Sequence, residues 1–79
     1  MTAKEMFEKL GYEHKYYREG FGFIGNHYEW KQPCNGAKKE LMFWEIDNTV
    51  SINNETDYGF SGAEIFAITQ QMKELGWIE

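Results

Sequence analysis

Residues 39–46 read KELMFWEI and form the most apolar stretch of the chain. Side chains alternate between the two faces of an extended strand, so Leu41 and Phe43 share one face. The opposite face carries three further apolar residues: Met42, Trp44 and Ile46. Apolar residues on both faces predict a central strand, or a strand whose outer face is covered by something else. The alternation leaves open which face meets the core. An inward Leu41 and Phe43 would leave the other three outside, as a patch that demands a partner.

Three further segments predict strands around this one. Residues 12–18 mix aromatic and charged side chains, and residues 49–53 return after a tight turn at Asp47-Asn48. Residues 27–32 alternate Tyr28 and Trp30 with polar residues, which is typical of a half-buried strand. Glycines at 20–25 predict a turn or bulged hairpin, and the Pro-Cys-Asn-Gly run at 33–36 predicts another turn.

A helix is expected over residues 3–10. Thr2 and Glu5 have the T-x-x-E spacing of a capping box, which satisfies two amide donors at a helix start. Gly11 supplies the left-handed conformation that ends many helices, and Tyr12 follows at the position that folds back onto the last turn.

A second helix is expected over residues 62–75. Ser61 and Glu64 repeat the capping-box spacing, and Gly76 follows the helix end. The stripe expected to face the core consists of Ile65, Ile68, Met72 and Leu75, widened by Phe66 or Ala67.

Together these segments predict one α+β domain over residues 1–79. The expected order is α-β-β-β(-β)-α, with an antiparallel meander sheet and both helices packed on one face. The length allows a single domain with a small core. The chain is 42% hydrophobic and 18% aromatic, too apolar for a disordered segment.

The composition also predicts the compartment. Cys34 is the single cysteine, so no intramolecular disulfide can form, and this favours a reducing environment. No apolar run approaches the length of about 18 residues needed to cross a membrane. The N-terminal residues are charged and amphipathic, unlike a signal peptide. We therefore expect a cytoplasmic protein with no membrane partner.

The net charge of −5 is unevenly distributed. Residues 1–40 carry seven Lys or Arg against six Asp or Glu, whereas residues 41–79 carry only Lys73 against seven Asp or Glu. The acidic second half is either a solvated surface or a surface that meets a basic partner.

No catalytic, cofactor or metal residue is expected, and no small-molecule substrate is evident. The two serines have no recognisable base. His14, His27 and Cys34 match no zinc-binding spacing. Residues 20–25 fit G-x-G-x-x-G, but a dinucleotide site needs a preceding apolar strand and a following helix.

Nucleic-acid binding is the alternative function. Aromatic residues interleave with basic ones in the middle of the chain, and Lys38 and Lys39 could meet phosphates. The helix–strands–helix order is shared with double-stranded-RNA-binding domains. Against this, the net charge is negative, and the second helix begins Ser-Gly-Ala-Glu at 61–64, where that family has lysines.

A protein–protein interaction module is the leading hypothesis, because the chain has more aromatic residues than one small core needs. Aromatic residues are enriched at the energetic centres of interfaces. The partner would be a second copy, giving a homodimer, or another protein such as a basic host factor. The candidate partner-binding residues are Trp44, Met42, Ile46, Tyr28 and Trp30.

The two ends of the sequence resemble small uncharacterised proteins encoded by phages and prophages of Gram-positive bacteria. The similar stretches are TAKEMFEKLGY at 2–12 and AITQQMKELGW at 67–77. The resemblance implies an accessory protein in the cytoplasm of a bacterial host. It assigns no catalytic or binding residue.

Overall fold

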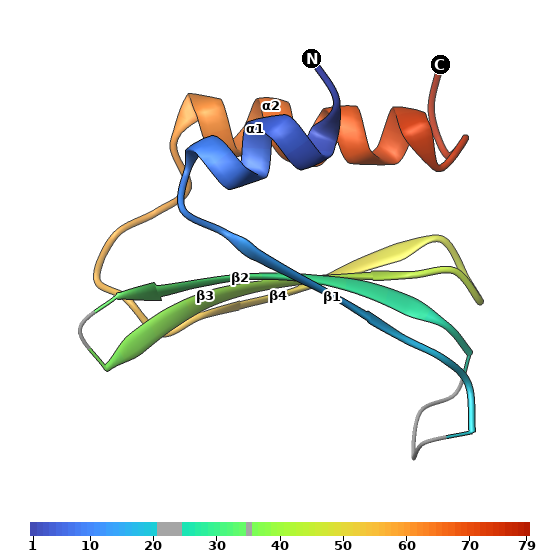
Figure 1. The fold of residues 1–79 in the computed structure, drawn as a ribbon, viewed down its shortest axis with the longest axis horizontal. Helices are drawn as coiled ribbons and strands as arrows, with labels where there is room; N and C mark the ends of the chain where they lie inside the picture. Colours follow the sequence, from blue (N-terminus) through green and yellow to red (C-terminus); the bar gives the residue numbers. More distant parts are fainter. Residues whose placement is uncertain (21–24, 35) are drawn as a thin grey trace.

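Four antiparallel strands form a meander sheet, and two helices cover one face of it (Figure 1). The computed structural model describes residues 1–20, 25–34 and 36–79. The sheet order β1-β2-β3-β4 follows the sequence. The elements are α1 (Ala3–Lys9), β1 (Glu13–Tyr17), β2 (His27–Cys34), β3 (Ala37–Trp44), β4 (Thr49–Asn54) and α2 (Gly62–Glu74). The predicted α+β fold with both helices on one face is confirmed.

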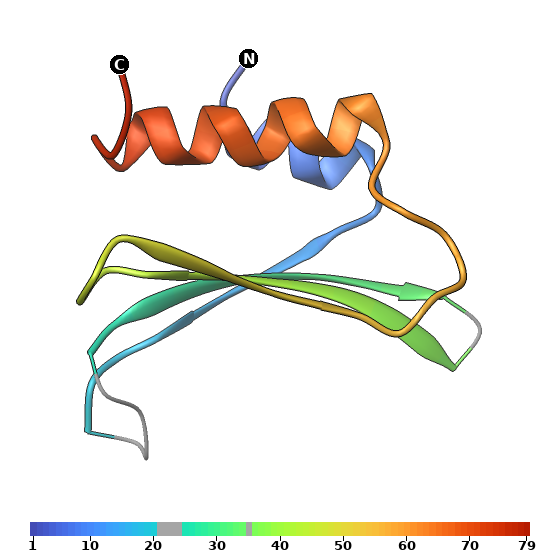
Figure 2. The same cartoon turned by 180° about the vertical axis from the view of Figure 1, so that it is seen from behind.

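The strand β3 faces the helices with Leu41 and Phe43, which have no exposed surface. The register places Trp30 of β2 opposite Leu41 and Tyr28 opposite Phe43, so these four residues share the helix-covered face. Val50 of β4 lies opposite Phe43 on the same face. Because side chains alternate along β3, Met42 and Trp44 lie on the opposite face of the sheet. Figure 2 shows that no helix covers this face.

Phe7 of α1 is the centre of the core. Its ring stacks on the Trp30 indole, with 4.6 Å between centroids and 18° between planes. Tyr12 and Phe43 meet the same ring edge-on at 5.2 Å and 6.5 Å. The buried apolar residues are Ala3, Phe7, Tyr12, Trp30, Leu41, Phe43, Ala67 and Ile68.

Both helices begin as their sequences predict. The Thr2 hydroxyl accepts a hydrogen bond from the Glu5 amide, and the Glu5 carboxylate accepts one from the Thr2 amide. Ser61 and Glu64 form the same reciprocal pair at the start of α2. Each box satisfies amide donors that have no partner within the helix.

Both helices also end alike. Gly11 and Gly76 adopt positive φ angles of 85° and 78°. The amides of the following residues, Tyr12 and Trp77, donate to the carbonyls of Phe7 and Met72, which is the Schellman arrangement. Because this bond turns the chain back, each aromatic ring returns to the core side of its own helix.

The buried face of α2 differs from the predicted stripe. Ile65 and Phe66 are 52% and 72% exposed, whereas Glu64 and Gln71 are buried with Ala67 and Ile68. The helix is rotated because its two polar residues find partners on the sheet, and a satisfied polar group can be buried. Met72 and Leu75 do pack against the core, as predicted.

The turn predicted at residues 33–36 is shorter than expected, because β2 continues through Pro33 to Cys34. The pairing of β2 with β1 ends at Lys31, so Pro33 lies where only β3 runs beside it. Proline is tolerated at such an edge position. Gly36 follows with a φ of +84°. Of the turn predicted at 20–25, residues 21–24 lie outside the described residues.

Candidate functional site

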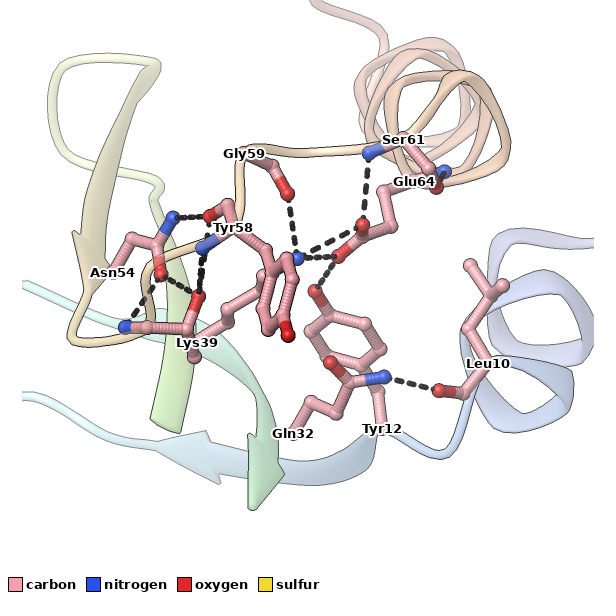
Figure 3. Close-up of polar contacts among 10 residues, drawn as sticks. Leu10, Tyr12, Gln32, Lys39, Asn54, Tyr58, Gly59, Ser61 and Glu64 are labelled. Carbon is pink, nitrogen blue, oxygen red and sulfur yellow. Dashed lines mark hydrogen bonds and ion pairs between the residues drawn. The ribbon is translucent and has the colours of Figure 1, made fainter. Parts of the chain in front are cut away.

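A buried polar cluster joins β3 to the start of α2 (Figure 3). Lys39 Nζ donates to the Gly59 carbonyl at 2.7 Å and to the Glu64 carboxylate oxygens at 3.1 and 3.3 Å. The Tyr12 hydroxyl donates to the same carboxylate, and the Ser61 amide does so at 2.8 Å. Lys39 is only 6% exposed and Glu64 only 5%.

The ammonium of this cluster has all its hydrogen-bond partners within the protein. A lysine ammonium has three hydrogens, and the carbonyl and the two carboxylate oxygens account for them. Lys39 Nζ also lies 4.9 Å from the centre of the Phe60 ring, whose face attracts cations. The arrangement holds the helix on the sheet. The sequence-based expectation that Lys39 could meet phosphates is corrected here, because its side chain is almost completely buried and its ammonium is bonded to Gly59 and Glu64.

The carboxyl group of Glu64 stays ionised despite its burial. Desolvation opposes the charge, but the bonds from Ser61 N–H, the Tyr12 hydroxyl and Lys39 outweigh it and lower the pKa of Glu64. The pKa of Tyr12 shifts in the opposite direction. Burial and the adjacent Glu64 carboxylate raise the pKa of its hydroxyl, so it remains a donor at all physiological pH values.

We expect the stabilisation from Glu64 to be lost in acid. Its pKa is lower in the folded chain than the ordinary 4.5, so the unfolded chain binds a proton first as the pH falls. The contribution is fully present above that ordinary value and is lost progressively as the pH falls from it through the lower pKa of the folded chain. Urea unfolding of wild type and Glu64→Gln between neutral pH and about pH 3 measures it. The difference in the free energy of unfolding between wild type and Glu64→Gln should decrease as the pH falls. A difference that is independent of pH would contradict the stabilising role of the ionised Glu64 carboxylate.

The helix-free face of the sheet has a charged part. Cross-strand neighbours there alternate in sign, as in Glu13 opposite Lys31 and Lys31 opposite Glu40. Lys38 Nζ lies 3.0 Å from a Glu40 carboxylate oxygen. Such alternation is typical of a solvated sheet surface.

A row of aromatic rings lies at the other end of the helix-free face, near the turn between β3 and β4. Tyr17, His27 and Trp44 lie side by side on β1, β2 and β3, and the His27 ring stacks between the other two at 4.7 and 4.1 Å. The indole N–H of Trp44 donates a hydrogen bond to the Ser51 hydroxyl of β4 at 3.0 Å. Burial lowers the pKa of His27, so its ring is neutral at pH 7.

Three of the five predicted partner-binding residues lie at this aromatic end. Met42 and Trp44 are half-buried on the helix-free face, and Ile46 follows β3 with 59% of its surface exposed. Tyr28 and Trp30 lie on the other face. Trp30 is 2% exposed and donates to the Gln71 side chain at 3.1 Å, so it is part of the core.

The acidic residues of the second half do not form one patch. Glu45 and Asp47 lie on either side of Ile46, at the turn between β3 and β4. Glu55 and Asp57 lie in the loop between β4 and α2, at the opposite end of the sheet (Figure 1). Ile46 is therefore an exposed apolar side chain in a turn where both of its neighbours in the sequence are acidic.

One apolar cleft was not predicted from the sequence. It lies between the two helices, has a volume of about 340 Å³, and is lined by Met1, Met6, Lys9, Leu10, Ala63 and Phe66. In the sequence, Phe66 could equally belong to the stripe of the second helix that was expected to face the core, so it did not indicate a cleft.

Within residues 1–20, 25–34 and 36–79, neither helix is long and apolar enough to cross a membrane. Over the same ranges, no group of three or more His, Cys, Asp or Glu side chains is placed to hold a metal ion.

Comparison with known proteins gives no match: no family model fits the chain, and no curated protein or solved structure is significantly similar to it. The resemblance to phage proteins stays an expectation.

Proposed function

We propose that this protein acts by binding another protein through the end of the helix-free face formed by Met42, Trp44 and Ile46. The observation that carries the proposal is the position of Ile46. It is 59% exposed and follows the half-buried Met42 and Trp44 at two-residue intervals, so it continues their series on the helix-free side of the sheet. Apolar side chains at the centre of a patch supply most of the energy of an interface.

The charge near this patch indicates the chemistry of the partner. Glu45 and Asp47 precede and follow Ile46 in the turn between β3 and β4, and the protein as a whole has a charge of −5. Interfaces commonly combine an apolar centre with a polar rim of complementary charge. A basic protein of the bacterial host fits this pattern, in line with the phage-type accessory role that the sequence ends suggest. Its affinity should fall as the salt concentration rises, because rim charges are screened.

Ile46→Lys tests the surface without disturbing the core. Wild type, Ile46→Lys and Phe66→Lys are used to capture proteins from a nuclease-treated bacterial lysate. Phe66 is the control because it is also highly exposed but lies on α2. A host protein retained by wild type and Phe66→Lys, but bound about tenfold more weakly by Ile46→Lys, is the expected result.

Two outcomes would overturn the proposal. A partner that all three proteins retain equally would bind elsewhere. A capture that depends on intact nucleic acid would favour the alternative function. The variant Lys38→Glu then tests that function, because Lys38 lies on the helix-free face. Lys39→Glu is unsuitable for this purpose, since it would place a second carboxylate beside the buried Glu64.

A further inference from the structure

The strand β4 is an edge that the sequence leaves without the usual protection. Among the described residues no strand lies beyond it, and its six residues, TVSINN, include no charged side chain and no proline. The other edge, β1, carries Glu13 and Lys15 within five residues. Charges and prolines on an edge prevent pairing with another chain, so β4 is the edge that can accept a strand.

The backbone of β4 is oriented for such pairing. The ladder with β3 continues one pair beyond the strand, where Glu55 N–H donates to the Lys38 carbonyl at 2.8 Å. Opposed pairs in an antiparallel ladder alternate between bonded and non-bonded. Counting back from Glu55, the amides and carbonyls of Val50, Ile52 and Asn54 therefore point away from β3, toward the open edge.

Apolar side chains accompany these backbone groups. Ile52 is 56% exposed, although it lies opposite Leu41 on the helix-covered face. Ile65 of α2 is 52% exposed. It lies about 100° around the helix from Glu64, on the flank away from Ala63 and the interhelical cleft, and hence away from α1. The views from both sides place α2 above the β4 side of the sheet. Ile52 and Ile65 are thus two exposed apolar side chains on the β4 side of the molecule.

We propose that a second copy of this chain pairs with β4 in antiparallel orientation, with Ile52 opposite the partner's Ile52. Val50 then faces the partner's Asn54, and each facing pair of outward residues exchanges two main-chain hydrogen bonds. The two sheets become continuous, and the exposed isoleucines of β4 meet across the two-fold axis. The dimer contact uses the open edge of β4, whereas the proposed protein-binding surface uses the helix-free face at the end of β3. A dimer can therefore be absent while a host protein still binds Ile46, so each proposal can fail without the other.

Strand length selects this register over its neighbours. With Ile52 on the axis, all three outward residues of β4 lie opposite outward residues of the partner's β4. A slide by two residues in one direction sets Asn54 opposite the partner's Asn48, which lies in a turn and has a φ of +56°. A slide in the other direction sets Val50 opposite the partner's Thr56, which is outside the strand. The edge is therefore complementary to itself, which favours a second copy over an unrelated segment.

Sedimentation equilibrium and amide hydrogen exchange test the dimer on the purified wild-type chain. The mass should rise from 9.4 kDa toward twice that value over about a hundredfold range of concentration. The amides of Val50, Ile52 and Asn54 should become protected over the same range. A mass of 9.4 kDa at every concentration would overturn the proposal, as would a dimer in which these three amides exchange freely.

Ile52→Pro provides a second test, because it removes a donor that points outward and keeps the ladder to β3. It should remain at 9.4 kDa where wild type is dimeric, while Phe66→Lys should dimerise as wild type does. A dimer that survives Ile52→Pro would place the contact elsewhere. The exchange experiment needs no variant, so it decides the matter even if Ile52→Pro does not fold.

Discussion

Lys39→Met is expected to lower the free energy of unfolding by about 3–5 kcal/mol, the loss typical when one partner of a buried ion pair is removed. Methionine keeps most of the apolar stem but leaves the Glu64 carboxylate buried, with only its neutral donors from Tyr12 and Ser61. The Gly59 carbonyl loses its donor as well. The total stability of a chain of this length is roughly 4–12 kcal/mol, so the variant should unfold at much lower urea. Tryptophan fluorescence during urea unfolding measures the change.

Lys38→Met is the matched control, one residue away. Lys38 lies 3.0 Å from Glu40 on the helix-free face, and its side chain is 38% exposed. Exposed pairs of this kind contribute less than about 1 kcal/mol. The double variant Lys39→Met/Glu64→Gln should recover part of the loss, because it removes the uncompensated charge. Equal effects of the two lysine substitutions would show that the buried cluster does not hold α2 on the sheet.

The helix boundaries could be predicted because their signals are local. Thr2 and Glu5 act on each other across one turn, and the same holds for Ser61 and Glu64. The glycine ends are equally local, since Gly11 needs only its own positive φ. Such features are specified by short stretches of sequence and do not depend on the rest of the fold.

The rotation of α2 could not be predicted in this way. Its polar core residue Glu64 is buried because Lys39 and Tyr12 reach it from positions 25 and 52 residues away in the chain. Gln71 is buried because Trp30 donates to it across 41 residues. The spacing of apolar residues along a helix treats Glu64 and Gln71 as surface residues. It therefore predicts a buried Ile65, which is exposed in the structure.

The part of the candidate binding surface that lies on a single strand could be predicted, because strand alternation alone determines which of its residues share a face. Met42 and Trp44 share a face by the two-residue period of β3, and Ile46 continues that series beyond the strand. Trp30 follows the same alternation on β2, but alternation does not say which residues of two strands share a face. That depends on the register, which sets Trp30 opposite Leu41 rather than beside Trp44.

Phe7→Ala is expected to cost about 3–5 kcal/mol, the range for deleting a large buried aromatic ring. The ring has no exposed surface and contacts Trp30, Tyr12 and Phe43, so its removal leaves a cavity among residues from β2, β3 and the connection between α1 and β1. The helix α1 has only seven residues, too few to be stable without packing. We therefore expect α1 to lose amide protection before the sheet does, in addition to the global loss seen in urea unfolding.

Phe66→Ala is the control for Phe7→Ala, because it deletes the same ring from a position that is 72% exposed. The comparison shows how much of the loss in stability is due to burial of the ring. The effect of Phe66→Ala should stay within about 0.5 kcal/mol, the range for surface substitutions. The contrast also tests whether α1 is held by its aromatic contact or by its neighbour α2. If the Phe7→Ala chain kept its amide protection in α1, the contact between the helices, including the Ala3 amide bonded to Glu74 at 2.7 Å, would be sufficient to hold it. Loss of that protection would assign the attachment of α1 to the stack of Phe7 on Trp30.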